Sequence, residues 1–188
     1  MDYKELGQKI KAKTYRTEHL ILRSFCDTDE DGLLELFRDE NTMRMDGDHP
    51  IYEKNEEFRR RIDLIKNGQL IWFFAEEEQS SEFVGYVMLQ DEVDAVALGF
   101  AITAAKQHIG YGYEMIYALV NILFENKTKE IRIKTWEKNL PCQKLAERLG
   151  FQKVGIVEDD HKDSMTGEVN NSYLYSLRNF RQIQTTHK

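Results

Sequence analysis

Short apolar segments with a two-residue period recur along the chain, and this alternation is typical of strands with one buried face. Together with their β-branched content, these segments predict seven strands, at residues 19–25, 70–75, 83–89, 93–102, 130–136, 151–157 and 173–177. Polar residues at 77–82 and 91–92 mark turns between them.

Helical spacing predicts four helices, over residues 27–37, about 58–67, 110–126 and 141–149. The first begins in an acidic N-capping cluster, which suits the helix dipole. Phe58, Ile62 and Ile65 recur at i, i+4 and i+7 in the second. The third is apolar on most faces and is expected to be central and buried. Pro141 near the start of the fourth and Gly150 after its end suit a helix start and stop.

The resulting element order is β-α-α-β-β-β-α-β-α-β-β. Three consecutive strands followed by a βαβ-type unit predict a mixed α+β sheet, not a doubly wound one. A length of 188 residues fits one domain with a core of its own. We divide the chain into a basic N-terminal extension (1–16), the domain (17–181) and a C-terminal tail (182–188).

The net charge of the chain limits the classes of molecule that it is expected to bind. The chain has 26 Lys and Arg against 33 Asp and Glu, a net −7 with a pI near 5.3. This excludes a nucleic-acid binder that works by bulk charge, and it suits cationic partners. Residues 1–17 carry a net +3, so the rest carries −10. The extension is expected to be a short helix or a loose arm, either solvated or used for docking.

The two cysteines, Cys26 and Cys142, lie far apart, and no CxxC or Cys/His cluster is present. We therefore expect free thiols, no metal site and a reducing, cytoplasmic location. No signal peptide is evident, and no apolar run reaches the roughly 18 residues of a membrane span, so no membrane partner is expected.

The segment with the clearest chemistry is a strand, 98–102, that leads through Gln107, Gly110 and Gly112 directly into a helix. A helix N-terminus beside glycines can bind an anion, because its first N–H groups have no internal partner. Ordinary loop glycines before a core helix are the alternative. Met115 breaks the dinucleotide-binding spacing, and no Gly-Lys-Ser/Thr follows, so neither a Rossmann fingerprint nor a Walker A loop is present.

Gln107-x-x-Gly110-x-Gly112 resembles the Q/R-x-x-G-x-G/A signature of the GNAT N-acetyltransferase superfamily, which binds the pyrophosphate of acetyl-coenzyme A (acetyl-CoA). Three further segments are similar to the branch that acetylates ribosomal-protein N-termini. They are Thr17-Glu18-His19-Leu20-Ile21-Leu22-Arg23 for T-E-R-L-x-L-R, Leu98-Gly99-Phe100 for I-G-Y, and Asn139-x-x-Cys142-x-x-Leu145-x-Glu147-x-x-Gly150-Phe151 for N-x-x-S-x-x-L-x-E-x-x-G-F.

The resemblance implies a central mixed, mostly antiparallel, twisted sheet of about seven strands with about four flanking helices. It also implies direct attack of an amine on the thioester of acetyl-CoA in a ternary complex. The fourth and fifth strands would splay and hold the pantetheine arm, and a strand N–H would stabilise the oxyanion. The implied cofactor contacts are Phe100, Ala101, Ile102, Gln107, His108, Ile109, Gly110, Tyr111, Gly112, Tyr113 and Asn139.

The proton-transfer positions depart from the family. The position of the usual glutamate base is Ala97, and that of the usual tyrosine acid is Ala146. Cys142 replaces the serine of the branch, and it is interpreted either as a donor to the CoA thiolate or as a packed core residue. Glu137 is a candidate base.

Several other ionisable residues have expected roles or positions. Asp94 and Glu92 are further candidate bases near a turn, and Glu114 matches a family glutamate with a structural role. His108 is expected to contact phosphate or to be a solvated loop residue. The polar segments around His49 and His161 place both histidines at the surface.

The leading hypothesis is therefore an acetyl-CoA-dependent N-acetyltransferase, as a monomer or homodimer. Its acceptor would be a protein N-terminal α-amine or a small cationic amine, walled by the acid-rich segment 27–40. A non-catalytic acyl-CoA-binding or regulatory module on the same fold is the alternative, and a different acyl donor is a third hypothesis.

Overall fold

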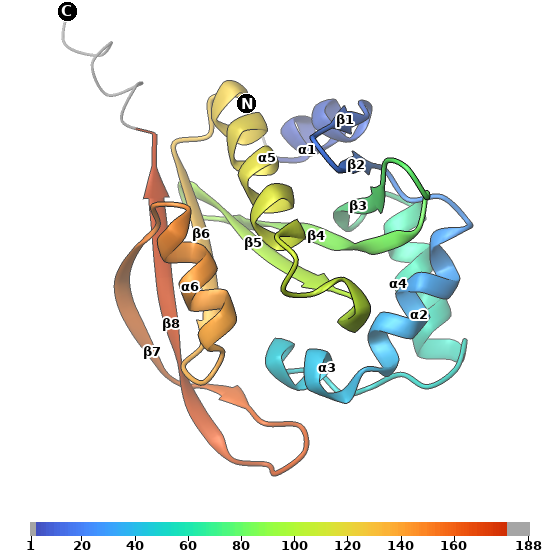
Figure 1. Cartoon of the computed structure of the whole chain (residues 1–188). Coiled ribbons are helices and arrows are strands. Elements are labelled where there is room, and N and C mark those ends of the chain that lie inside the picture. The colour runs from blue at the N-terminus through green and yellow to red at the C-terminus, as the bar shows by residue number, and fades with distance from the viewer. Residues whose placement is uncertain (1–2, 180–188) are drawn as a thin grey trace, which may run out of the picture.

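An eight-stranded sheet forms the centre of the computed structural model, which describes residues 3–179 (Figure 1). The strands are β1 (Tyr15–Arg16), β2 (Leu20–Arg23), β3 (Ile71–Glu77), β4 (Phe83–Glu92), β5 (Ala95–Ile102), β6 (Glu130–Trp136), β7 (Gln152–Lys162) and β8 (Val169–Arg178). Their spatial order is β1-β2-β3-β4-β5-β6-β8-β7. Every neighbouring pair is antiparallel except β5 and β6. The predicted mixed, mostly antiparallel α+β sheet is confirmed.

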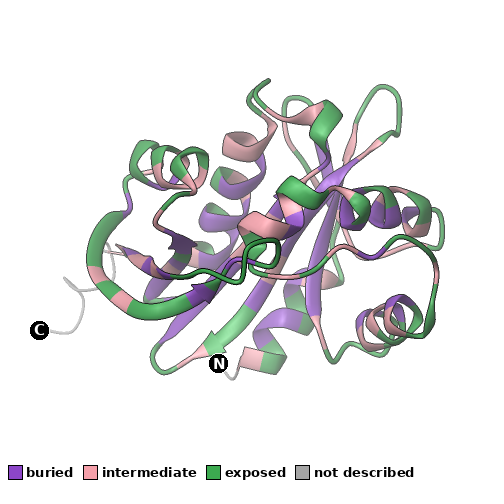
Figure 2. Cartoon of the chain, turned by 90° about the horizontal axis from the view of Figure 1, so that it is seen from below, coloured by how far each residue is buried: buried purple, intermediate pink, exposed green. Residues whose placement is uncertain are grey.

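Helices cover both faces of this sheet. They are α1 (Tyr3–Lys11), α2 (Asp29–Arg38), α3 (Glu40–Asp46), α4 (Glu56–Lys66), α5 (Tyr111–Glu125) and α6 (Leu140–Arg148), with a short 3₁₀ helix, η1 (Ala104–Lys106). Alternate residues of β3 explain the two layers, because Phe73 joins the core beneath α1, α5 and α6, whereas Trp72 and Phe74 join the core beneath α2, α3 and α4. Figure 2 shows buried residues concentrated in the strands and on the inner sides of the helices.

The third predicted helix is α5, and it is as buried as its apolar sequence indicates. Met115, Ile116, Leu119 and Leu123 are fully buried. The hydrophobic effect therefore fixes α5 against the sheet, and with it the position of the preceding loop.

At the N-terminal helices one predicted detail was wrong and one helix was not predicted. The acidic cluster lies at the start of α2, but the Thr28 side chain caps nothing, and buried Asp29 instead pairs with Arg23 of β2. The segment after α2 forms a separate helix, α3, which begins where the Asp39 carboxylate accepts a hydrogen bond from the Thr42 N–H at 2.7 Å. Only Met43 of α3 is buried, so the helix has no apolar stripe that periodicity could detect.

Elements at the edges of the sheet also differ from the prediction. The strand pair β7–β8 is longer than expected, because β7 lies at the sheet edge and its polar residues extend the pairing into solvent. The basic extension contains α1, whose Leu6 and Ile10 are buried against the sheet. The boundary after residue 16 stays a prediction, and the tail 182–188 lies outside the described residues. No helix within residues 3–179 is long and apolar enough to cross a membrane.

Candidate functional site

The parallel strands β5 and β6 separate soon after they pair. Their register contains only Val96 opposite Ile131 and Ala97 opposite Arg132. Beyond these pairs β5 continues to Ile102 with no pairing to β6, so backbone groups on that edge are available to another extended, amide-bearing chain. Phe100, Ala101 and Ile102 lie on this stretch.

The N-terminus of α5 opens beside the same stretch. Gly110, its N-cap, has φ +104°, and a Cβ built there would meet nothing within 4 Å. The first helical hydrogen bond runs from the Glu114 N–H to the Gly110 carbonyl, so the N–H groups of Tyr111, Gly112 and Tyr113 have no partner within the helix. Space, free N–H groups and the helix dipole together make this corner suitable for an anion.

Gly112, unlike Gly110, lies in a closely packed position. A Cβ at Gly112 would lie 3.0 Å from Leu145 Cδ1 of α6 and 3.2 Å from Ile102 Cδ1 of β5. Its missing side chain therefore allows α5 to pack closely where β5 and α6 flank the opening.

Gln107 fixes the loop between η1 and α5. Its Nε2 donates to the Ile102 carbonyl at 2.9 Å and lies 3.4 Å from Thr42 Oγ1 of α3. The adjoining His108 has a left-handed backbone with φ +62°, and the Ile109 side chain is exposed. The predicted phosphate contacts of these residues remain predictions.

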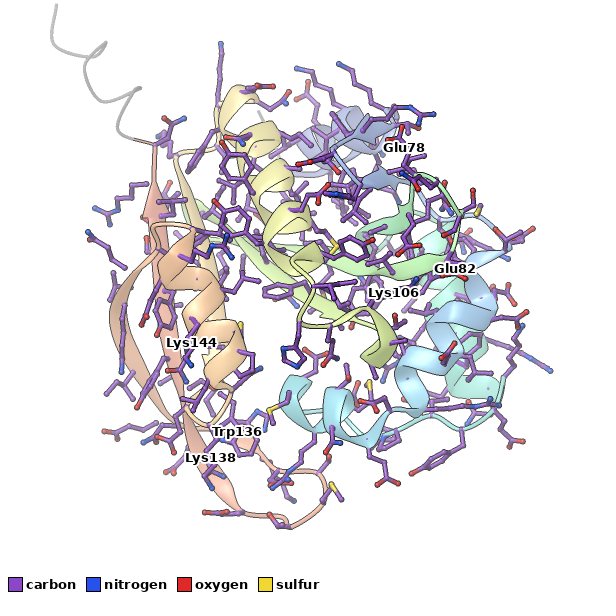
Figure 3. The ribbon with its side chains drawn as sticks, in the orientation of Figure 1. Glu78, Glu82, Lys106, Trp136, Lys138 and Lys144 are labelled. Carbon is purple, nitrogen blue, oxygen red and sulfur yellow. The ribbon has the colours of Figure 1, made fainter. Side chains whose placement is uncertain are left out.

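Glu77, at the end of β3, braces the loop from the other side. It accepts from Lys106 Nζ of η1 at 2.9 Å and from the Tyr111 hydroxyl at 2.8 Å, and Lys106 also pairs with Glu82 (Figure 3). Hydrogen bonds from Ser80, Lys106 and Tyr111 lower the pKa of Glu77 to about 2. The carboxylate is therefore charged at neutral pH and holds three elements together.

Glu114 makes a similar connection to the N-terminal strands. Its carboxylate accepts from Thr17 Oγ1 at 2.5 Å and from the backbone N–H of His19 at 2.7 Å, and it pairs with His19 Nδ1 at 2.9 Å. These contacts join the segment before β2 to α5, which agrees with the structural role expected of Glu114.

Asn139 and Cys142 lie where α6 begins, beyond the end of β6. Asn139 Oδ1 caps the helix by accepting from the Cys142 N–H at 3.2 Å, which leaves the amide N–H₂ of Asn139 for other partners. Burial raises the pKa of the half-buried Cys142 thiol to about 11, although a hydrogen bond with Thr135 opposes this shift. The thiol is thus protonated at neutral pH and is a donor, not a thiolate nucleophile.

The candidate bases from the sequence lie apart from each other. Glu137 follows β6 and is tied to β8, where its carboxylate accepts from the backbone N–H of Asn171 at 3.3 Å. Asp94 and Glu92 lie at the other end of β5, beyond the pairing with β6, and Glu92 pairs with Arg132 there. Only Glu137 is at the end where β5 and β6 diverge.

One histidine expected at the surface is buried. His161 belongs to β7 and is 6% exposed, because its ring stacks on Trp136 of β6 with centroids 4.5 Å apart. Burial lowers the pKa of His161. The polar neighbours in its sequence concealed this contact, which spans distant segments. His49 is exposed as predicted, and it pairs with Glu57.

Sequence reasoning missed the contribution of α3 to the site. Arg44 reaches Asp163 near the β7–β8 turn at 2.6 Å and lies over the Trp136 ring, 5.5 Å from its centroid. The helix could have been found from its ends, since Asp39 caps the start and Gly47, with φ +77°, ends it.

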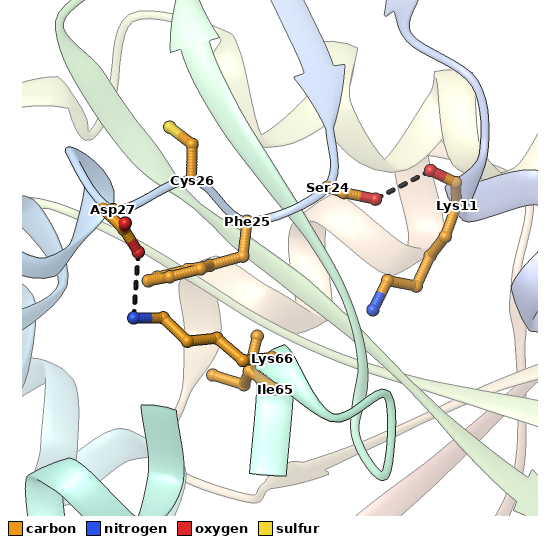
Figure 4. A pocket seen from close by; sticks show the side chains of 7 residues that line it. All are labelled: Lys11, Ser24, Phe25, Cys26, Asp27, Ile65 and Lys66. Atoms are coloured by element: carbon orange, nitrogen blue, oxygen red, sulfur yellow. Dashed lines mark hydrogen bonds and ion pairs between the residues drawn. The ribbon is translucent and has the colours of Figure 1, made fainter. Parts of the chain in front are cut away.

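A separate hollow of about 650 Å³ lies at the C-terminal end of β2, away from the loop before α5 (Figure 4). It is lined by Lys11, Ser24, Phe25, Cys26, Asp27, Ile65 and Lys66. Leu20, at the other end of β2, pairs with Glu77 beside the loop, so the hollow is not part of the site. Within residues 3–179, no three His, Cys, Asp or Glu side chains group so as to hold a metal ion.

Comparisons with known proteins agree with this architecture. The family model described as the acetyltransferase (GNAT) domain matches residues 19–152. The uncharacterized N-acetyltransferase p20 of Bacillus licheniformis is 25% identical over 174 residues, which cover 88% of this chain and 96% of p20.

Two solved structures show the same fold at low identity. The ribosomal L7/L12 α-N-protein acetyltransferase, in complex with CoA, matches with a TM-score of 0.75 at 18% identity, over 88% of this chain and 98% of the other. The spermidine N-acetyltransferase from Vibrio cholerae, in complex with CoA and spermine, matches with a TM-score of 0.74 at 18% identity, over 86% and 96%. With the family model covering more than half of its length, the chain belongs to the GNAT family of N-acetyltransferases.

Proposed function

We propose that this enzyme transfers an acetyl group from acetyl-CoA directly to a primary amine, either a protein N-terminal α-amine or a small cationic amine. The divergence of β5 from β6 beside the open N-terminus of α5 carries this proposal. The free edge of β5 at Phe100–Ile102 suits the pantetheine amides, and the loop from Gln107 to Tyr113 suits the pyrophosphate. The amide N–H₂ of Asn139, which takes no part in the helix cap, would donate a hydrogen bond to the pantetheine arm.

In this proposal the enzyme works mainly by orienting the two reactants, without a covalent intermediate. A backbone N–H of the free β5 edge stabilises the charge that develops on the thioester oxygen. The Cys142 thiol, beside the diverging strands, donates a proton to the departing sulfur. Glu137 is held near the same end by β8 and can accept the proton that the nitrogen loses as the tetrahedral intermediate collapses.

The acids of α2 offer less to a cationic acceptor than their number suggests. Asp29 is paired with Arg23 at 2.8 Å, and Asp31 is paired with Lys54 at 2.7 Å. Glu30 lies 3.5 Å from the same lysine. Cation recognition by α2 is therefore weaker than the sequence predicts, because these charges are already compensated within the protein.

A turnover assay tests the proposal. The purified protein is mixed with acetyl-CoA and with a peptide bearing a free N-terminal serine, the same peptide with a blocked N-terminus, or spermidine. We expect CoA release with at least one free amine and an acetylated product by mass spectrometry. CoA binding without release on any amine would instead support the acyl-CoA-binding module, which the buried Ala97 and Ala146 favour, since neither side chain can move a proton.

A further inference from the structure

Helix α3 spans the gap between the ends of β5 and β6. At one end of the gap, Thr42 of α3 approaches Gln107. The Gln107 side chain donates a hydrogen bond to the carbonyl of Ile102, the last residue of β5. At the other end Arg44 lies over Trp136, the last residue of β6. Met43 is buried beneath the helix, and α3 contacts both strands. The last residue of α3, Asp46, is therefore held where the two strands diverge.

Asp46 differs from the other acids around it because its carboxylate has no hydrogen bond or ion pair with any residue in the range 3–179. Asp48 pairs with Arg61 at 2.6 Å, and Asp163 pairs with Arg44. Asp46 is also open to solvent. It is thus a negative charge that remains free to meet a cation arriving from outside.

Three elements besides α3 face the Asp46 carboxylate. Burial raises the pKa of Tyr86 on β4 and of Cys142 on α6, and the charge of Asp46 adds to both shifts. Arg61 of α4 and Asp48 in turn act on the pKa of Asp46. Loss of hydration raises the pKa of Asp46 to about 6. The charge of Asp48 also raises this pKa, and the charge of Arg61 lowers it. Asp46 follows Thr42 and buried Met43 by four and three positions, so helix geometry places it on the side of α3 that packs towards β5 and β6.

We propose that Asp46 binds the ammonium of the acceptor and takes one of its protons, so that it serves as the base of the acetyl transfer. This inference rests on the proposed function. The freed nitrogen lone pair forms the C–N bond, the C–S electron pair leaves with sulfur, and the sulfur gains a proton. The nitrogen loses its second proton as the intermediate collapses, and one proton in total passes to solvent.

The chemistry of this base favours an α-amine as acceptor. An α-ammonium has an ordinary pKa of about 8, whereas an alkyl ammonium of the lysine type has about 10.4. Transfer to a carboxylate that titrates near 6 is therefore uphill by about two pKa units for the α-amine and more than four for the alkyl amine. The free N-terminus of a peptide is thus the substrate class that suits Asp46.

The test compares Asp46→Asn with Glu56→Gln, using acetyl-CoA and the peptide with a free N-terminal serine. Glu56 is an exposed acid in the first turn of α4, outside the acid-rich segment 27–40, so E56Q controls for the loss of one negative charge. We expect D46N to lower kcat/KM by about 10²-fold or more, and E56Q to leave it unchanged. CoA affinity, measured by calorimetry, should be the same in all three proteins.

The pH profile separates a base from a structural residue. With Asp46 as base, kcat/KM of the wild type follows the ionised carboxylate and the ammonium, and therefore rises through pH about 6 and falls above about 8. In D46N the limb at about pH 6 is replaced by a rise that follows the free amine and levels off above about pH 8. Asp48→Asn removes a charge that raises the Asp46 pKa, so its low-pH limb should move to lower pH.

An active wild type with an equally active D46N, or with the same pH profile in D46N, would overturn the role of Asp46 and leave the proposed function standing. A wild type that binds CoA and acetylates no amine would overturn both. A higher kcat/KM for spermidine than for the peptide would contradict the α-amine preference.

Discussion

At the residue scale, the surroundings of Cys142 make it a neutral donor. Burial raises the pKa of its thiol to about 11, with the charge of Asp46 adding to the shift, and its backbone N–H is held by Asn139. The side chain also packs against the larger core, so its presence alone does not separate a packing role from a chemical one. The two roles predict different responses to substitution.

Cys142→Ala should lower kcat by about 10²-fold if the thiol protonates the leaving sulfur, whereas Cys142→Ser, which keeps a donor, should retain most of the activity. Steady-state kinetics with a saturating peptide acceptor measures both. Cys26→Ala is the matched control, since Cys26 is the other free cysteine and lies at the separate hollow. Equal kcat in C142A and the wild type would assign Cys142 to packing.

At the scale of elements, one carboxylate joins three of them around the loop before α5. Glu77 ends β3, Lys106 belongs to η1 and Tyr111 begins α5, and the two partners reach the same Glu77 oxygen. Because the folded-state pKa of Glu77 is lowered from 4.5 to about 2, the network stabilises the fold fully above about pH 4.5. The stabilisation is lost as pH falls towards 2.

Glu77→Gln should therefore lower the free energy of unfolding at pH 7 by about 1 kcal/mol, and the difference from the wild type should shrink at pH 3. Urea denaturation at the two pH values measures this. Glu78→Gln is the control, since Glu78 forms a more exposed pair with Arg16 and should change stability less. A difference that stays constant or grows on acidification would contradict the assigned pKa.

At the scale of the whole molecule, the sequence predicts those elements whose burial is periodic. The strands of the sheet and α5 follow directly from the apolar pattern, and the loop from Gln107 to Gly112 follows from its glycines. The apolar pattern does not predict the two-residue strand β1 or the helix α3, because neither has an apolar stripe of its own.

Contacts between distant segments limited the prediction of the site. His161 is buried by Trp136, which lies 25 positions earlier, and no local pattern indicates that stacking. The net charge of −7 suggested cationic partners, but Asp29, Glu30 and Asp31 of α2 are compensated by Arg23 and Lys54. In our proposal a single unpaired carboxylate, Asp46, therefore matters more for the acceptor than the total charge does.

The central claim is that CoA lies along the diverging strands with its phosphates at the N-terminus of α5, and calorimetric titration of CoA into Gly110→Trp tests it most directly. Gly68→Trp is the matched control, because Gly68 also has a positive φ, +69°, and also has nothing within 4 Å of a built Cβ. The indole at position 110 would fill the anion corner, so we expect at least a tenfold loss of affinity, about 1.4 kcal/mol, in G110W and none in G68W. Equal CoA affinity in the two variants would contradict the claim.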